Sequence, residues 1–354
     1  MAPTEHQQTD EAPTGVAPPG DPPAPSPSWL ERVNWAQILT NYATLLVLLV
    51  LIVVFSIFEP DTFPKTSNIQ TMISTQSVLG LLALGTVAPL IVGEFDLSVA
   101  SNLSFSAIVA ALMISHGHGV VLALLAVLGV GIVIGLINAV LLLRLQINSF
   151  IATLGTGIIL AGLGLWASNG DTVYKNVGGE ILSLGQTIIF GFLPLAGVYV
   201  LVAAVGLWYL FERTPLGREM YITGYGREAA RLAGIPIQRR IMFGFVLSGV
   251  FAALAGFLNT ANLGSASPSV GDAFLLPAFA AAFLGSTTIR TGRFNIPGTI
   301  VGIAFLAVGT TGLQLAGAQY YIQDFFNGLA LLVAVAASQV GVRRLKNRSA
   351  RAGA

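Results

Sequence analysis

A small set of polar side chains interrupts the apolar stretches of this chain. These residues are Asp96, Ser98, Asn102, Asn138, Asn148, Thr153 and Gln314. Amides and hydroxyls donate and accept hydrogen bonds without carrying charge, so most of this set suits contact with a neutral, hydroxyl-bearing solute. The same groups can instead join helices, because polar side chains inside a membrane need partners. The sequence leaves both roles open.

Two carboxylates, Glu94 and Asp96, lie between apolar segments. A charged carboxylate at the bilayer centre costs about 2.5 to 3.5 kcal/mol on insertion scales, so both are expected in a break between helices. Asp96 has two candidate roles. It caps a helix by accepting from the free amides near Ser98 and Val99, or it contacts the solute or acts in gating.

The most charged internal segment covers about residues 212–240. It predicts a short helix over residues 227–233, because Gly234 suits a left-handed stop. A short polar helix at the face of a membrane protein is a candidate docking element. The alternative is that Glu228 and Arg231, three residues apart, only form a surface ion pair.

The elements that must position these groups are ten apolar stretches separated by short polar breaks. A crossing helix needs about 20 mostly apolar residues. The 354 residues are 54% hydrophobic and 9% charged, whereas soluble domains carry roughly 25% charged residues. The sequence therefore predicts an all-α integral membrane protein. The predicted spans cover residues 38–58, 69–92, 97–115, 119–143, 149–167, 187–211, 241–258, 273–285, 298–316 and 322–340.

Other residue types narrow the possible chemistry. The chain has no cysteine, which excludes disulfides and thiolate metal sites. Its three histidines are too few and too badly placed for a metal site, and His116 and His118 are expected in a loop. No basic stripe interleaved with aromatics occurs, so nucleic acid is not an expected partner. Gly131 and Gly135 form a G-x-x-x-G pair, which is typical of close helix packing.

The distribution of basic residues predicts the orientation, since Lys and Arg near span ends are retained in the cytoplasm. With ten spans and both termini inside, 15 of the 17 basic residues fall inside, and only Lys65 and Lys175 fall outside. Residues 1–36, which include eight of the 17 prolines, are predicted to be a disordered cytoplasmic tail. Residues 37–341 form the predicted membrane domain, and residues 342–354 a basic cytoplasmic tail.

Four ordered blocks carry a family resemblance. Glu228, Ala229 and Ala230, with Arg231 and then Gly234, resemble the EAA-x-x-x-G coupling loop of importer permeases of the ATP-binding-cassette class. Together with residues 214–218, the stretch 228–235 resembles the corresponding block of the ribose/xylose/galactose-type permease family within the branched-chain amino acid/sugar permeases. Three further blocks resemble the same family: residues 95–99 (compare IDLSV), 150–156 (compare PFIATLGT) and 264–268, the last followed by Leu284, Gly285, Gly292 and Arg293.

The resemblance implies a non-catalytic, multi-pass permease subunit in the bacterial cytoplasmic membrane. Its implied partners are an ATP-binding-cassette ATPase subunit, an extracytoplasmic solute-binding protein and a second permease copy. The chain lacks a phosphate-binding loop of the form G-x-x-x-x-G-K-[ST], so no cofactor is expected in this chain and ATP is expected in the partner subunit. The implied cargo is a sugar or sugar-like solute.

Two departures from the family pattern concern the cargo. Glu94 stands where the family usually has glycine, and residues 274–279 replace a block with an acidic position. An ion-coupled secondary transporter of a small polar solute is the alternative function. Such transporters usually need intramembrane acids or broken helices that coordinate the ion. Apart from Glu94, Asp96 and Asp324, which lies near an outer span end, the sequence offers none.

Overall fold

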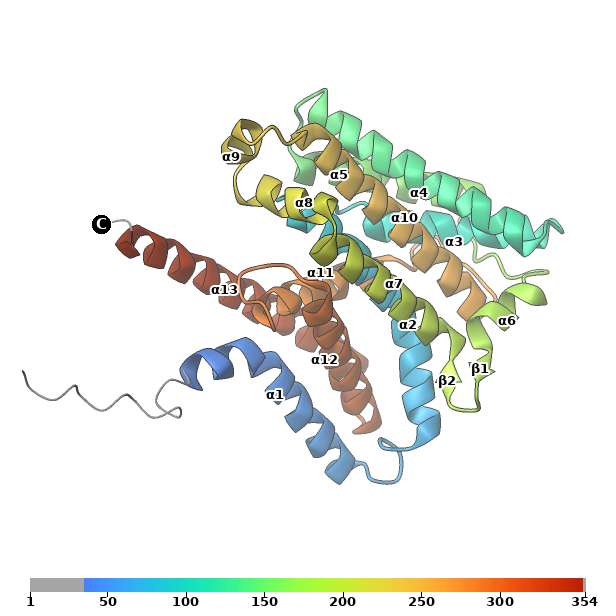
Figure 1. Ribbon diagram of the computed structural model, residues 1–354. Helices are drawn as coiled ribbons and strands as arrows, with labels where there is room; N and C mark the ends of the chain where they lie inside the picture. The colour runs from blue at the N-terminus through green and yellow to red at the C-terminus, as the bar shows by residue number, and fades with distance from the viewer. Residues whose placement is uncertain (1–34, 353–354) are drawn as a thin grey trace, which may run out of the picture.

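The computed structural model describes the backbone of residues 35–352 and the side chains of residues 42–338. This part of the chain is a bundle of α-helices with one pair of two-residue antiparallel strands, in which Ile188 pairs with Pro194 and Ile189 with Leu193 (Figure 1). The elements are α1 (Trp35–Phe58), α2 (Thr66–Ile91), α3 (Val99–Ser115), α4 (Val120–Leu143), α5 (Ser149–Ser168), α6 (Glu180–Gln186), β1 (Ile188–Ile189), β2 (Leu193–Pro194), α7 (Leu195–Arg213), α8 (Pro215–Tyr225), α9 (Arg227–Leu232), α10 (Ile237–Leu263), α11 (Asp272–Thr287), α12 (Ile296–Leu315) and α13 (Tyr320–Ala352).

Each of the ten predicted spans overlaps one helix, and the all-α membrane fold is confirmed. The sixth predicted span, residues 187–211, was placed too early, because its first residues form β1 and β2 and the helix α7 begins only at Leu195. Seven of these ten helices are long and apolar enough to cross a membrane, while α3, α11 and the apolar part of α1, Tyr42–Phe58, are shorter. Helix α11 extends past both ends of the predicted stretch and is continuous through Pro277 in its interior. The number of crossings stays a prediction.

The structure describes only part of the two predicted tails. Residues 1–34 of the proline-rich tail lie outside the described residues, and Trp35 already belongs to α1. The basic C-terminal segment continues α13 as far as Ala352.

Helices α2 and α10 form the centre of the bundle. Helix α10 packs against α4, α2 and α3, while α2 also contacts α7, α11 and α12. Glycines allow this close approach: a Cβ atom would lie 2.6 Å from the Gly249 carbonyl oxygen if added at Gly131, and 2.5 Å from that of Phe245 if added at Gly135. The predicted packing role of the G-x-x-x-G pair on α4 is therefore confirmed.

The loops gather at two opposite ends of the bundle. Figure 1 shows α9, the start of α1 and the end of α13 toward one end, and α6 with β1 and β2 toward the other. We call these the α9 end and the α6 end. This arrangement agrees with the predicted topology, in which the α9 end is cytoplasmic, and the absolute orientation stays a prediction.

Candidate coupling and permeation sites

Helix α9 is the short helix predicted from the charged segment. It covers Arg227–Leu232 and ends in a left-handed turn at Gly234, whose φ is 73°. The Gly234 amide donates to the Arg231 carbonyl at 3.0 Å, and the Ile235 amide donates to the Ala230 carbonyl at 3.0 Å. These two bonds form a Schellman motif, which satisfies carbonyls that the end of a helix leaves free.

The side chains of α9 divide into a buried and an exposed face. Ala230 is fully buried, whereas Glu228, Ala229 and Arg231 are exposed and Leu232 is 88% exposed. The carboxylate of Glu228 lies in the first turn, where the helix dipole favours negative charge. The exposed face therefore combines charge with one large apolar side chain.

An ion pair holds α9 against the bundle. Arg227 Nη2 donates to Oε1 of Glu94, which lies in the segment between α2 and α3 and is 6% exposed. The Glu228–Arg231 ion pair that the spacing allowed is not among the contacts of the described residues. Sequence reasoning missed the Arg227–Glu94 pair, although one signal was available: both charges lie in segments assigned to the same side of the membrane.

Helix α8 (Pro215–Tyr225) gives α9 a fixed base. Thr214 caps it by accepting from the Gly217 amide at 3.2 Å. A Cβ atom at Gly217 would lie 2.3 Å from the Phe211 carbonyl oxygen, and one at Gly224 would lie 2.0 Å from that of Ile91. These glycines let α8 lie directly against α7 and the end of α2, which explains the spacing of Thr and Gly in this block.

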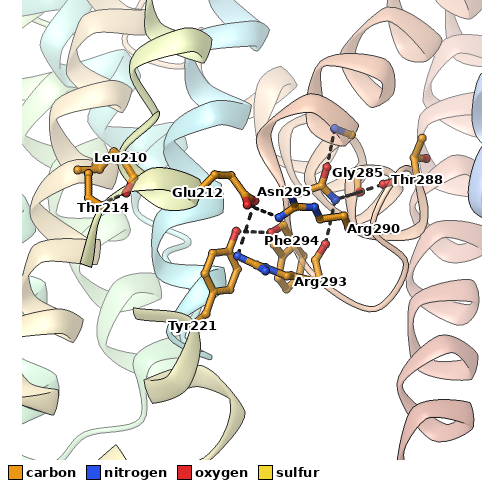
Figure 2. Close-up of polar contacts among 11 residues, drawn as sticks. Leu210, Glu212, Thr214, Tyr221, Gly285, Thr288, Arg290, Arg293, Phe294 and Asn295 are labelled. Carbon is orange, nitrogen blue, oxygen red and sulfur yellow. Dashed lines mark hydrogen bonds and ion pairs between the residues drawn. The ribbon is translucent and has the colours of Figure 1, made fainter. Parts of the chain in front are cut away.

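A second polar network joins the start of this charged segment to the loop between α11 and α12 (Figure 2). Glu212 pairs with Arg290 and, at 3.6 Å, with Arg293. The Arg293 guanidinium carbon lies 3.5 Å from the centroid of the Tyr221 ring, and the Tyr221 hydroxyl donates to the Phe294 carbonyl at 2.7 Å. Burial raises the pKa of Tyr221 to about 12, so this hydroxyl remains a donor at physiological pH.

Asn295 fixes the same loop to α12. Its side-chain oxygen accepts from the Gly298 amide at 2.8 Å, which caps α12. Its side-chain amide donates to the carbonyl of Gly285 at 2.8 Å and to that of Thr288 at 3.2 Å, as Figure 2 shows. Sequence reasoning did not select Asn295 or the Glu212 network, because neither forms a local pattern.

The structure brings three of the predicted pathway residues together. Oδ1 of Asp96 accepts from the Ser98 hydroxyl at 2.6 Å and from the Ser98 amide at 3.1 Å. Asn138 on α4 donates to the Ser98 hydroxyl at 2.8 Å and to Asp96 at 3.4 Å. All three residues are 1% exposed, and Asp96 Oδ2 and Asn138 Oδ1 have no partner among the described residues. Their contacts lie at the start of α3 and join it to α4.

The other predicted pathway residues are dispersed. Asn102 is fully buried and donates to the Gly249 carbonyl on α10 at 2.9 Å, and Thr153 on α5 accepts from the Leu97 amide at 3.0 Å. Asn148 is exposed and caps α5 by accepting from the Phe150 amide at 2.9 Å. Gln314 is exposed near the end of α12, toward the α6 end.

The charged groups of the described residues do not assemble into a metal centre. Among residues whose side chains are placed, no group of three or more His, Asp or Glu side chains could hold an ion. His116 and His118 lie in the loop between α3 and α4, as predicted.

Comparison with known proteins gives one consistent family. The family described as branched-chain amino acid transport system / permease component matches residues 68–335. The ribose import permease protein of Bacillus subtilis is 32% identical over 308 residues, which cover 86% of this chain and 94% of the relative. The D-allose transport system permease protein of Escherichia coli is 31% identical over 304 residues, covering 86% and 93%.

The galactose/methyl galactoside import permease protein of Escherichia coli is 29% identical over 342 residues, which cover 90% of this chain and all of the relative. No solved structure matches the chain significantly. The matched region contains all four sequence blocks and the α8–α9 segment. With its helical membrane fold, the chain belongs to the family of branched-chain amino acid transport system permease components.

Proposed function

We propose that this chain is the membrane-spanning permease subunit of an ATP-binding-cassette importer for a neutral sugar or sugar-like solute. The main support for this proposal is that ribose, allose and galactose permeases match most of the length of the chain. ATP is bound and hydrolysed by a separate ATPase subunit. The permease forms the route through the bacterial cytoplasmic membrane, and a solute-binding protein delivers the cargo outside.

In this proposal, α9 is the element on which the ATPase subunit docks. The helix lies at one end of the bundle (Figure 1), exposes Glu228, Ala229, Arg231 and Leu232, and is fastened to the segment before α3 through Arg227. A docking helix can transmit force only if it is held at its base. The Schellman turn at Gly234 and the ion pair to Glu94 support such a role.

The same ion pair supports a connection through which movement caused by the ATPase could be transmitted to the membrane helices. Glu94 is two residues from Asp96, which lies in the buried network at the start of α3. Movement of α9 would therefore reach α3 and, through Asn138, α4. We propose that Asp96, Ser98, Asn102, Asn138 and Thr153 respond to this movement, and that Asn148 and Gln314 lie near the two mouths of the route.

A second copy of the chain is proposed as the other half of the permease, after the family pattern. Several helices, among them α5 and α13, expose large apolar side chains such as Ile158, Trp166 and Leu332. Lipid or a second copy would cover such faces in the membrane.

The test is co-purification of the membrane-embedded chain with its ATPase subunit. Glu228→Ala and Gly234→Val should leave the permease in the membrane but weaken ATPase co-purification and abolish solute-stimulated ATP hydrolysis. Glu228→Ala removes the exposed carboxylate, and valine at Gly234 strains a backbone with φ of 73°. The control changes Asn176→Ala and His118→Ala, at the other end of the bundle, should leave ATPase assembly intact.

Full transport by both α9 variants at normal expression would show that α9 is not the docking element. Uptake that persists in vesicles without ATP, but follows a proton or sodium gradient, would instead support the ion-coupled secondary transporter.

A further inference from the structure

A cavity of about 550 Å³ opens between α2, α10, α11 and the α6–β1 segment, at the α6 end. None of the described residues that line it is charged. Its polar lining consists of hydroxyls and carboxamides, and its apolar lining includes Phe274 and Val270. Sites for small molecules have volumes of roughly 300 to 1,000 Å³ and combine apolar walls with a few placed polar groups.

One face of α2 supplies most of the hydroxyls. Gln70, Thr71, Ser74 and Thr75 recur at the spacing of successive helical turns and all line the cavity. The Thr71 hydroxyl donates to the Ser67 carbonyl and the Thr75 hydroxyl to the Thr71 carbonyl, both at 2.9 Å. Because their protons are engaged, these threonine oxygens offer lone pairs to donors in the cavity.

Two of the carboxamides that line the cavity, those of Asn259 and Asn262, come from the end of α10. Asn259 is 4% exposed and lines the cavity, yet its side-chain oxygen has no hydrogen-bond partner among the described residues. The Asn262 amide donates to the Ser74 carbonyl at 3.1 Å, and its side-chain oxygen also lacks a described partner. Buried carboxamide oxygens without partners cost free energy, so a donor is expected to reach them.

The residues that line the cavity indicate which kind of molecule could bind in it. Lipid chains would bring no donor to the oxygen of Asn259, and an ion would find no counter-charge among the lining residues. A monosaccharide brings several hydroxyl donors and acceptors together with C–H faces that pack against Phe274 and Val270. Its hydroxyls suit the exposed oxygen of Thr75. They suit the buried oxygens of Asn259 and Asn262 once these side chains rotate toward the cavity.

We propose that this cavity is the site that receives a neutral monosaccharide at the α6 end, before it passes toward α9. The proposal rests on the proposed import function. It adds Ser74, Thr75, Asn259 and Asn262 to the solute contacts, none of which is a residue selected from the sequence.

The natural absence of cysteine allows a direct test, since any introduced thiol is the only one in the chain. Thr75→Cys places a thiol in the cavity. Ser77→Cys, on the same helix, is a buried control, because Ser77 is 2% exposed and faces the protein core. Val133→Cys on α4 is a control on an exposed apolar face. Each variant is expressed with its ATPase and binding protein in cells and treated with the membrane-impermeant reagent sodium (2-sulfonatoethyl)methanethiosulfonate.

We expect the reagent to modify Thr75→Cys at least ten times faster than either control. Modification should then reduce uptake of whichever of D-ribose, D-allose and D-galactose the untreated cells import. Independently, Asn259→Leu should raise the KM for that sugar about tenfold, the loss of one hydrogen bond. Gln319→Leu, a similar change in the loop before α13, should leave the KM unchanged.

Two results would overturn the proposal. Slow reaction of Thr75→Cys, at the rate of the controls, would show that lipid or a second copy fills the cavity. Rapid reaction without loss of uptake would show a water-filled cavity off the route. ATPase co-purification, measured in parallel, separates these results from failure of the import function, in which even the unmodified chain would bind no ATPase.

Discussion

The ion pair between Arg227 and Glu94 should determine how firmly α9 is held, and Arg227→Gln removes it. The side chain of Arg227 is 54% exposed and that of Glu94 is 7% exposed. In burial, the pair is therefore intermediate between two classes. Exposed ion pairs stabilise a protein by about 0 to 1 kcal/mol, and disruption of buried ones costs about 3 to 5 kcal/mol. An intermediate value of about 2 kcal/mol is expected for the loss.

Amide hydrogen exchange measures this loss directly. Helix α9 has six residues and is too short to be stable alone, so its protection depends on contacts with the bundle. A loss of about 2 kcal/mol raises the open population about thirtyfold, because 1.4 kcal/mol corresponds to a factor of ten. In lipid nanodiscs, mass spectrometry should show peptides covering residues 226–235 exchanging about thirtyfold faster in Arg227→Gln.

Arg231→Gln provides the matched control. It removes the same charge from the same helix, but Arg231 forms no ion pair within the described part of the chain, so exchange should stay near the wild-type rate. Glu94→Gln should accelerate exchange less than Arg227→Gln does, because the arginine left behind stays hydrated while a lone buried carboxylate does not. Equal exchange in Arg227→Gln and Arg231→Gln would refute the role of the ion pair.

Two further predictions concern topology and pH. A reporter active only in the cytoplasm should be active when fused after Arg240 or Ala354 and silent when inserted near Asn176, and the opposite pattern at either inner site would overturn the orientation. Because burial raises the pKa of Tyr221 from its ordinary 10.0 to about 12, its contribution to stability should be complete below pH 10 and lost as the pH rises through 12. Melting in detergent should show this loss between pH 10 and 12, and Tyr221→Phe should reduce it.

Local sequence patterns predicted the features that depend only on residues close together in the chain. The apolar stretches predicted ten helices, since hydrophobicity over about 20 residues sets what a bilayer accepts. Gly234 predicted the end of α9, because a left-handed backbone favours glycine. Gly131 and Gly135 predicted a close helix contact, although the partner, α10, was not identifiable from their spacing.

The candidate sites depend on contacts between distant segments. Arg227 meets Glu94 across 133 positions and Arg290 meets Glu212 across 78. The predicted topology placed both arginines on the cytoplasmic side, but nothing in the sequence identified a carboxylate partner for either of them. Asp96, Ser98 and Asn138 were selected individually as polar residues in apolar surroundings, and only the packing of α3 against α4 shows that they bond to one another.

The α6-end cavity shows the same division. The sequence by itself determined that this chain spans a membrane as helices with few charges inside, because composition and period are properties of each segment alone. Only the tertiary structure decided that the hydroxyls of α2 lie beside the carboxamides of α10. In the contact between Ser74 and Asn262, the two residues are almost 190 positions apart in the sequence. The physical reason is that side-chain hydrogen bonds act over about 3 Å, and only the packing of the helices brings such distant residues within that range.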